Sequence, residues 1–334
     1  MPNHRWNILA ILVYVTSASA APVDYRLQLP FGLSEQAFNV PQENPLMEEK
    51  VALGRELFSD TRLSADETLA CVTCHMPARG FSDGRPLSSG FKGREPGRNT
   101  PTIVNRAFGR SHFWDGRASS LEETILLTLR TQLGSTDEEI VRKFSRIRGY
   151  PEQFQRVLGT PVTADGVVKA LAAFVRTIFS GNSPFDRFNA GERTALSIEA
   201  QRGFKLFKRK AKCTKCHKGF NFTDEQFHNT GIGLYDPTPD LGRYDVTHRD
   251  EDKGAFKTPT LRDVAQTAPY MHDGSLRTLE EVIEFYDEGG IKNPYLAQEL
   301  KPLHLTFQEK GDLLAFLNSL TGAWLAVPAP PPPN

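Results

Sequence analysis

Two five-residue stretches of the chain contain paired cysteines: Cys71-Val72-Thr73-Cys74-His75 and Cys213-Thr214-Lys215-Cys216-His217. Both have the pattern Cys-x-x-Cys-His, and together they contain every cysteine of the 334-residue chain. Cysteines three residues apart lie on one face of a helical turn, so both sulfurs can reach the two vinyl groups of one porphyrin. The adjacent histidine then binds the iron as proximal ligand. The sequence therefore predicts two covalently bound haem c groups, held by Cys71, Cys74 and His75 and by Cys213, Cys216 and His217.

Three other uses of these motifs are open: a redox-active dithiol, a zinc site and two short disulfides. A tetrahedral zinc site needs four ligands, and the two motifs together could supply them. Haem is favoured because both motifs have the same five-residue form and follow an export signal.

The first twenty residues have the order of a secretory signal peptide. His4 and Arg5 precede an apolar run from Ile8 to Val15, and the small residues Ala18-Ser19-Ala20 follow. The run is too short to cross about 30 Å of hydrocarbon, which argues against a membrane anchor. We therefore expect cleavage after Ala20, a periplasmic location and a mature chain that is not attached to a membrane.

The composition excludes several classes of protein. Apolar residues make up 39% of the chain, which is enough for a buried core. Lysine and arginine (40) balance aspartate and glutamate (40), so nucleic acid is not an expected partner. Four cysteines are too few for a small scaffold held together by disulfides.

The two halves of the chain repeat one another around the haem motifs. The paired segments are Gly54–Phe58 with Gly203–Phe207, Thr100–Thr102 with Thr258–Thr260, Asp115-Gly116 with Asp273-Gly274, and Leu121–Ile125 with Leu279–Ile283. A repeat of this kind indicates one supersecondary plan used twice. Here that plan is a haem domain.

The remaining pattern is helical, with long loops. Helical spacing of apolar residues predicts helices over 53–58, 140–147, 167–179, 198–207, 279–286 and 310–320. Ser135 or Thr136, with Glu138 or Glu139, predicts a capping box before Ile140. We expect a mainly α fold of two cytochrome c-like haem domains related by the repeat. The expected divisions are a signal peptide (1–20), an N-terminal extension (21–45), the two haem domains (46–190 and 191–323) and a proline-rich tail (324–334).

The chain resembles the bacterial di-haem cytochrome c peroxidase and MauG family over nearly all of its mature length. The motifs that carry the resemblance are the two Cys-x-x-Cys-His segments, Arg98–Thr102, Phe113–Ala118 and Thr267–Gly274. The resemblance implies two cytochrome c-like α domains with a calcium ion and a tryptophan between the haems. It also implies that the N-terminal haem meets hydrogen peroxide and that the C-terminal haem transfers electrons.

The resemblance also gives roles to single residues. Trp114 matches the inter-haem tryptophan, and Asn99, Thr267 and Pro269 match the calcium-site positions, the last two through backbone oxygens. Core packing is the commoner use of a tryptophan, and Asn99 alone would be an ordinary turn residue.

Tyr286 decides the branch of the family. Peroxidases of the family place a methionine ligand fourteen residues after the histidine of a His-x-Gly motif, and His272 plus fourteen is Tyr286. None of the methionines after the signal peptide, Met47, Met76 and Met271, suits that position. The resemblance therefore implies a tyrosine ligand, as in MauG, although a tyrosine on the apolar face of a helix is an ordinary alternative. An anionic phenolate favours high-valent iron, whereas a thioether favours reduced iron.

The first haem has no equivalent sixth ligand. The repeat matches Tyr286 to Thr128, and the loop histidine of the peroxidases appears here as Phe91. We interpret His112 as a surface or hydrogen-bonding residue. The first haem should therefore be five-coordinate and open.

The residues expected to assist peroxide cleavage differ from the family pattern. The family's distal glutamate aligns with Gln132 and its distal glutamine with Thr124. An amide cannot carry a proton as a carboxylate does. Either Gln132 only positions water, or Asp137 or Glu123 supplies the acid, or peroxide activation is slow.

The leading hypothesis is a periplasmic MauG-like enzyme that uses hydrogen peroxide to form a high-valent state shared by two haems. It would oxidise a tryptophan or tyrosine of a partner protein, as in the branch that contains MauG and MbnH. The alternatives are a cytochrome c peroxidase with a small donor cytochrome and a plain electron carrier.

Seven basic residues between Lys205 and Lys218 form either a docking patch for an acidic partner or a solvated face.

Overall fold

The computed structural model describes residues 25–93 and 97–324, so the expected signal peptide and all but one residue of the proline-rich tail lie outside the described residues. The α-helices are α1 (Glu48–Phe58), α2 (Cys71–Cys74), α3 (Leu121–Thr131), α4 (Asp137–Phe144), α5 (Tyr150–Leu158), α6 (Ala164–Val175), α7 (Pro184–Asn189), α8 (Ile198–Lys208), α9 (Tyr244–Thr247), α10 (Leu279–Asp287) and α11 (Phe307–Asn318). The strands are β1 (Ser180–Gly181), β2 (Phe227–Asn229), β3 (Ala255–Lys257) and β4 (Ala323–Trp324).

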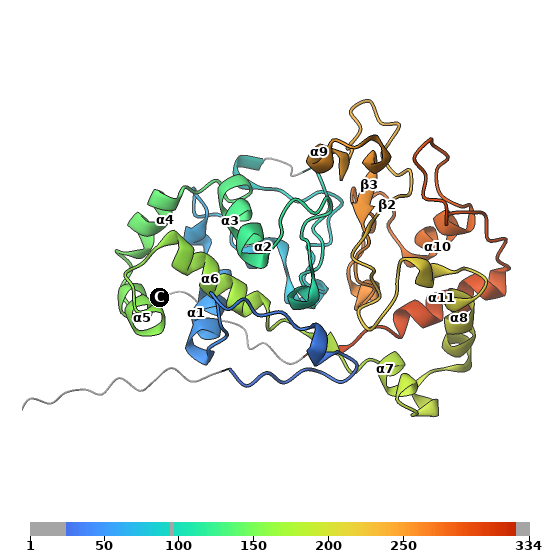
Figure 1. Ribbon diagram of the computed structural model, residues 1–334, viewed down its shortest axis with the longest axis horizontal. Helices are drawn as coiled ribbons and strands as arrows, with labels where there is room; N and C mark the ends of the chain where they lie inside the picture. Colours follow the sequence, from blue (N-terminus) through green and yellow to red (C-terminus); the bar gives the residue numbers. More distant parts are fainter. Residues whose placement is uncertain (1–24, 94–96, 325–334) are drawn as a thin grey trace, which may run out of the picture.

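Each half contains one closely packed helix pair (Figure 1). In the first half α1 packs on α6, and in the second α8 packs on α11. A glycine lies at each crossing: a Cβ on Gly54 would overlap the carbonyl oxygen of Ala170, and one on Gly203 would overlap that of Asp312. The repeat in the sequence is thus a repeat of one close helix crossing.

The two halves have separate apolar cores. The first core includes Leu57, Phe144 and Phe154, which are fully buried among α1, α4, α5 and α6. The second is rich in aromatic rings, such as Phe207 and Phe316, whose centroids lie 5.0 Å apart. The mainly α, two-domain expectation is confirmed.

Hydroxyl side chains begin most of the helices. Thr136 caps α4 and forms a capping box with Glu139, as the sequence predicts. Ser120 and Thr278 cap α3 and α10, which occupy matching places in the repeat. Helix α5 was not expected, because Pro151 falls in its first turn, where proline is tolerated and gives little helical signal.

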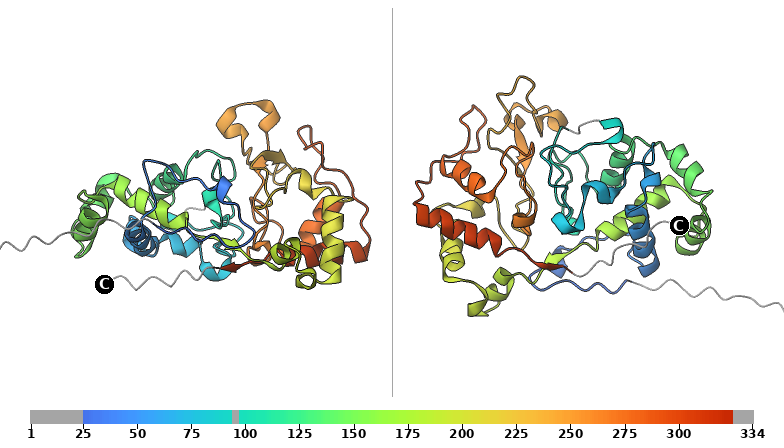
Figure 2. Two further views of the ribbon diagram at one scale, coloured as in Figure 1. Left: turned by 60° about the horizontal axis from the view of Figure 1, so that its bottom comes forward. Right: turned by 180° about the vertical axis from the view of Figure 1, so that it is seen from behind.

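A short strand pair ties the end of the second half to the link between the halves. β1 follows α6 and pairs antiparallel with β4, with Ser180 opposite Trp324 (Figure 2). The Asn105 side chain exchanges two hydrogen bonds with the backbone of Ser180, each 3.0 Å long. The link is therefore held by segments from both halves.

A reciprocal pair of main-chain hydrogen bonds crosses the boundary between the halves. The Asn99 N–H donates to the His272 carbonyl (2.6 Å), and the Lys257 N–H donates to the Trp114 carbonyl (2.7 Å). In the repeat Asn99 corresponds to Lys257, and Trp114 corresponds to His272. The two bonds are therefore related by a pseudo-two-fold axis.

Ion pairs reinforce this boundary. Arg98 binds Asp240 through two nitrogens (2.6 and 2.8 Å) and Asp115 through a third (2.6 Å). Arg243 donates to the carbonyls of Asp115 and Gly116.

Within the described residues, no helix is long and apolar enough to span a membrane.

The glycine crossings generate a stability prediction. Gly54→Ala and Gly203→Ala should each lower the free energy of unfolding by about 1–3 kcal/mol, because the new methyl group overlaps a backbone carbonyl. Gly311→Ala in α11 is the matched control, since a Cβ there meets open space and alanine favours a helix by up to about 1 kcal/mol. Denaturation of the haem-loaded proteins, followed by circular dichroism, measures the difference. Equal stability of the Gly54 and Gly311 variants would contradict the close crossing.

Candidate haem sites and the cavity between them

One cavity reaches both Cys-x-x-Cys-His motifs. Side chains of α3 and α6 line it in the first half, and side chains of α10 and α11 line it in the second. Trp114 is also part of its lining. The cavity therefore unites the two sequence motifs and the residue expected between them.

The first motif has the geometry that a c-type haem requires. Cys71 and Cys74 lie at the two ends of the single turn α2, and both line the cavity. The His75 Nδ1 is 3.0 Å from the Phe81 carbonyl, so Nδ1–H donates and Nε2 is left for a metal. Burial lowers the pKa of His75, which keeps the ring neutral, as a ligand must be.

The second motif repeats this geometry. Cys213 begins a short 3-10 turn, and the His217 Nδ1 lies 3.0 Å from the Phe222 carbonyl. Burial also lowers the pKa of His217, and it raises the pKa of the Cys213 thiol to about 12. A thiol with such a pKa is a poor redox nucleophile, which disfavours the dithiol alternative. All four cysteines are free of disulfides.

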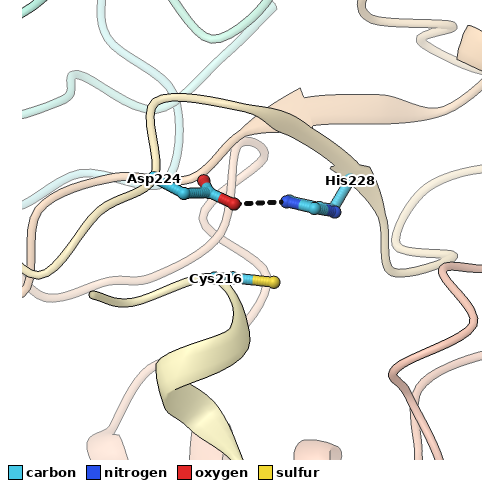
Figure 3. A group of neighbouring side chains, drawn as sticks. All are labelled: Cys216, Asp224 and His228. Atoms are coloured by element: carbon cyan, nitrogen blue, oxygen red, sulfur yellow. Dashed lines mark hydrogen bonds and ion pairs between the residues drawn. The ribbon is translucent and has the colours of Figure 1, made fainter.

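A zinc site built by both motifs is not formed. Among residues 25–93 and 97–324, the only close cluster of potential metal ligands is Cys216, Asp224 and His228 (Figure 3). Its three ligand atoms lie within 4.8 Å of one another, and the His228 Nε2 is 3.0 Å from an Asp224 oxygen. Cys216 belongs to the second Cys-x-x-Cys-His motif, so this cluster lies beside that motif and does not join the two motifs.

Tyr286 lies on the second-half side of the cavity. It is near the end of α10, and its hydroxyl has no hydrogen-bond partner among the described residues. Burial raises the pKa of Tyr286, and the nearby Cys213 and Cys216 raise it further. The side chain is therefore directed toward the second haem motif and away from the apolar core, which is the orientation that an iron ligand needs.

On the first-half side of the cavity, no described residue of α3 offers an iron ligand comparable with Tyr286. Thr124, Thr128 and Gln132 line this side from α3 and its C-terminal end. Phe91 is not on the cavity wall, because its ring packs over Gly134. A small hydroxyl occupies the position that matches Tyr286.

The two acids considered for peroxide cleavage do not face the cavity. Glu123 accepts hydrogen bonds from the backbone and hydroxyl of Ser119, both at 2.7 Å. Asp137 pairs with Arg130 at the surface. Of the three alternatives, the one in which Asp137 or Glu123 supplies the acid therefore has no geometric support.

Trp114 is fixed by both halves. Its indole Nε1–H donates to the Asn99 carbonyl at 2.9 Å, and its own carbonyl accepts from Lys257 of the second half. This differs from core packing, because the ring lines the cavity between the two motifs.

The positions matched to a calcium site also belong to the lining of this cavity. Asn99, Thr267 and Pro269 all line it, although Asn99 comes from the other half of the chain. The Asn99 side-chain NH₂ donates to the Arg85 carbonyl (2.8 Å), so its oxygen is turned the other way and has no partner among the described residues. Oxygen donors of this kind fit calcium.

The sequence did not reveal the role of His112 and its neighbours. His112 is buried and bonded to Arg106, so the surface alternative is wrong and the hydrogen-bonding alternative is correct. Lys257 and Glu225 complete a charged group with these residues. The internal repeat gave one clue to this charged group. Lys257 occupies the position that corresponds to Asn99, one of the residues already expected at the site.

Comparison with known proteins agrees with this geometry. A family model for di-haem cytochrome c peroxidase matches residues 48–194, and one for cytochrome c matches residues 200–321. The chain is 41% identical to the methylamine utilization protein MauG of Methylorubrum extorquens over 296 residues, covering 87% of this chain and 83% of that protein. It is 38% identical to the cytochrome-c peroxidase IdrP1 of Denitromonas iodatirespirans over 347 residues, covering 94% and 92%.

A solved structure is similar over most of its length. The crystal structure of a MauG-like protein associated with microbial copper homeostasis superposes with a TM-score of 0.83 and 35% sequence identity, covering 89% of this chain and 96% of that one. The chain therefore belongs to the bacterial di-haem cytochrome c peroxidase and MauG family, and is a haem-dependent oxidoreductase with two c-type haems.

Proposed function

We propose that this protein is a periplasmic MauG-like oxidase, which takes oxidising equivalents from hydrogen peroxide and uses them on a tryptophan or tyrosine of a partner protein. The bound haems would supply the redox chemistry. The observation that carries the proposal is Tyr286, whose unpartnered hydroxyl lines the cavity near Cys213 and Cys216. A hard, anionic ligand there favours an oxidised second haem.

The first-half side of the cavity supports peroxide access at the first haem. Thr124 donates its hydroxyl to the Ser120 carbonyl (2.7 Å), and a neutral threonine hydroxyl is a poor ligand for haem iron. Gln132 lines the cavity at the end of α3 and can hold a water or peroxide by hydrogen bonds. Its amide cannot deliver a proton, so we expect a slow peroxide step.

Trp114 supports transfer of oxidising equivalents between the halves. The indole lies on the cavity wall, and hydrogen bonds to both halves fix its position. A ring held there would divide a long electron transfer into two shorter steps. Calcium bound by Asn99, Thr267 and Pro269 would tie the same two halves together beside it.

The surface near the second haem suits an acidic partner. All seven basic side chains between Lys205 and Lys218 are exposed, and Lys210 is paired with Glu309. Phe307, two residues before Glu309, is 95% exposed. An apolar ring beside a cluster of cations is typical of a docking surface for a protein with an acidic rim.

A cytochrome c peroxidase that takes electrons from a small cytochrome is the second candidate. The match to IdrP1, which is named a cytochrome-c peroxidase, favours it. The two candidates differ in the oxidation state that reacts with peroxide. In the oxidase the first haem reacts in the fully ferric protein, whereas in the peroxidase it reacts only after the protein has been half-reduced.

The first test is the reaction of the fully ferric protein with hydrogen peroxide. Because Thr124, Thr128 and Gln132, which line the first-half side of the cavity, are poor iron ligands, both haem spectra should change on mixing without any reductant. Rapid-mixing absorption spectroscopy follows the change, and the same protein after reduction by one electron is the comparison. Reaction only after reduction would favour the peroxidase and remove the main support for the oxidase.

The second test concerns the ligand of the second iron. Tyr286→Phe should abolish the low-spin histidine–tyrosine signal in the paramagnetic resonance spectrum. Tyr270→Phe is the matched control, because Tyr270 also lines the cavity but its hydroxyl donates to the Val264 carbonyl at 3.0 Å. An unchanged spectrum in the Tyr286 variant, or the same loss in the Tyr270 variant, would refute the assignment.

The third test concerns Trp114. In the wild type the two haem spectra should change together after peroxide is added. Trp114→Phe should make the second haem lag by at least about tenfold, equivalent to about 1.4 kcal/mol in activation free energy. Trp114→Tyr should restore part of the rate, since a phenol can be oxidised. If Phe and Tyr behave alike, the indole has only a structural role.

A further inference from the structure

A buried charged network crosses the boundary between the halves. It consists of Arg106 and His112 from the first half and Glu225 and Lys257 from the second. The Lys257 Nζ donates to Glu225 Oε1 at 2.8 Å, and Arg106 approaches the same oxygen at 3.4 Å. The backbone N–H of Arg110 donates to the other carboxylate oxygen. Only 6% of Lys257 and 4% of His112 is exposed.

The partner of His112 shows which ring nitrogen carries hydrogen. An Arg106 NH₂ group lies 3.2 Å from the His112 Nδ1. A guanidinium can only donate, so Nδ1 accepts and the hydrogen is on Nε2. Burial, followed by the charge of Arg106, lowers the pKa of His112 to about 2, so the ring stays neutral. Its Nε2–H is a donor and not a metal ligand.

None of the described residues accepts a hydrogen bond from the His112 Nε2, and the ring lines the cavity. A buried N–H group without an acceptor is destabilising. An acceptor that occupies the cavity would remove this cost.

The charges of the network are also unbalanced. Arg106 and Lys257 share one carboxylate, which leaves one positive charge in a buried place. The next acid, Asp224, is bonded to His228 and to the Gln226 backbone. The other cations on the cavity wall are accounted for: Arg98 and Arg117 pair with Asp115 and Asp240, and the three lysines Lys212, Lys215 and Lys301 are exposed.

We propose that His112 and Lys257 bind a propionate carboxylate of the haem attached to Cys71 and Cys74, while Arg106 holds the His112 ring through Nδ1 and adds a second positive charge. A carboxylate is an acceptor for the His112 Nε2–H and a counter-ion for the two cations, and each haem carries two of them. His112 and Arg106 belong to the first half, so they assign the site to the first haem. The Lys257 main chain also holds the Trp114 carbonyl, which places this anchor beside the indole.

The proposed propionate site predicts how the reduction potential of the first haem depends on Lys257. A positive charge near a haem favours the ferrous form over the ferric form. The Lys257→Gln substitution removes that charge, and Glu225 then has only Arg106 as a cationic partner. The ferric-to-ferrous ratio of the first haem at a fixed potential should rise about tenfold, which is 59 mV for a one-electron couple.

The experiment is a spectroelectrochemical titration of the two-haem protein, with resonance Raman detection of the propionate bending band. Intact mass first verifies two haems in each variant. Lys257→Gln should shift the potential and the band of the first haem, and Lys257→Arg should restore the potential. His112→Phe should shift the band because the Nε2–H is lost. Lys301→Gln is the matched control, because this exposed lysine lies on the same cavity and water screens its charge.

The proposal is overturned if Lys257→Gln and His112→Phe both leave the first haem's potential and Raman band unchanged, or if the shifts fall on the second haem. Only the link to Trp114 electron transfer rests on the proposed function. Since the titration uses no peroxide and no partner, a failure of the oxidase proposal leaves this result interpretable.

Discussion

The close crossing of two helices at a glycine is the contact on which each half of the molecule depends. Gly54 lets α1 approach α6, and Gly203 lets α8 approach α11, with the backbone of one helix against the other. The helix that contains the glycine leads into the Cys-x-x-Cys-His motif in both halves. The crossing therefore determines where the two sulfurs and the histidine lie relative to the cavity.

The two halves share this scaffold but differ in the side chains that face the cavity. Position 286 carries a phenol, and the matching position 128 carries a small hydroxyl. Position 114 carries an indole, and the matching position 272 an imidazole that stacks on Phe256 with centroids 3.5 Å apart. One scaffold can thus hold two chemically similar groups in different environments. This division is what a protein needs if one metal centre receives a small oxidant and the other passes the oxidation on.

The local parts of this arrangement could be predicted from the sequence. The haem motifs and the amphipathic helices are short-range patterns, and the repeat is visible because such patterns recur in the same order. The structure has each of the expected helices, although α4, α6 and α11 begin and end a few residues earlier than expected. The direction of Glu123 could also have been inferred, since Ser119 and Ser120 precede it at the start of α3 and their hydroxyl and backbone groups engage its first turn.

The charged network could not be predicted in the same way. Arg106, Glu225 and Lys257 are far apart in the chain, and their meeting depends on how the halves dock. The hydrogen position on His112 depends on a single contact with Arg106, which no spacing rule reveals. Phe91 aligns with a ligand position, but a local packing contact with Gly134 turns its ring away from the cavity.

The reciprocal hydrogen bonds between Asn99 and His272 and between Lys257 and Trp114 have the form of an isologous interface, in which one patch pairs with a copy of itself. In a symmetric dimer of single-haem units, a substitution at such a patch would appear twice. In one continuous chain the two copies can diverge independently while the main-chain bonds persist. Joining the two units in one polypeptide thus allows tryptophan on one side only and lysine on the other, so any electron transfer through Trp114 would use one side of the boundary only.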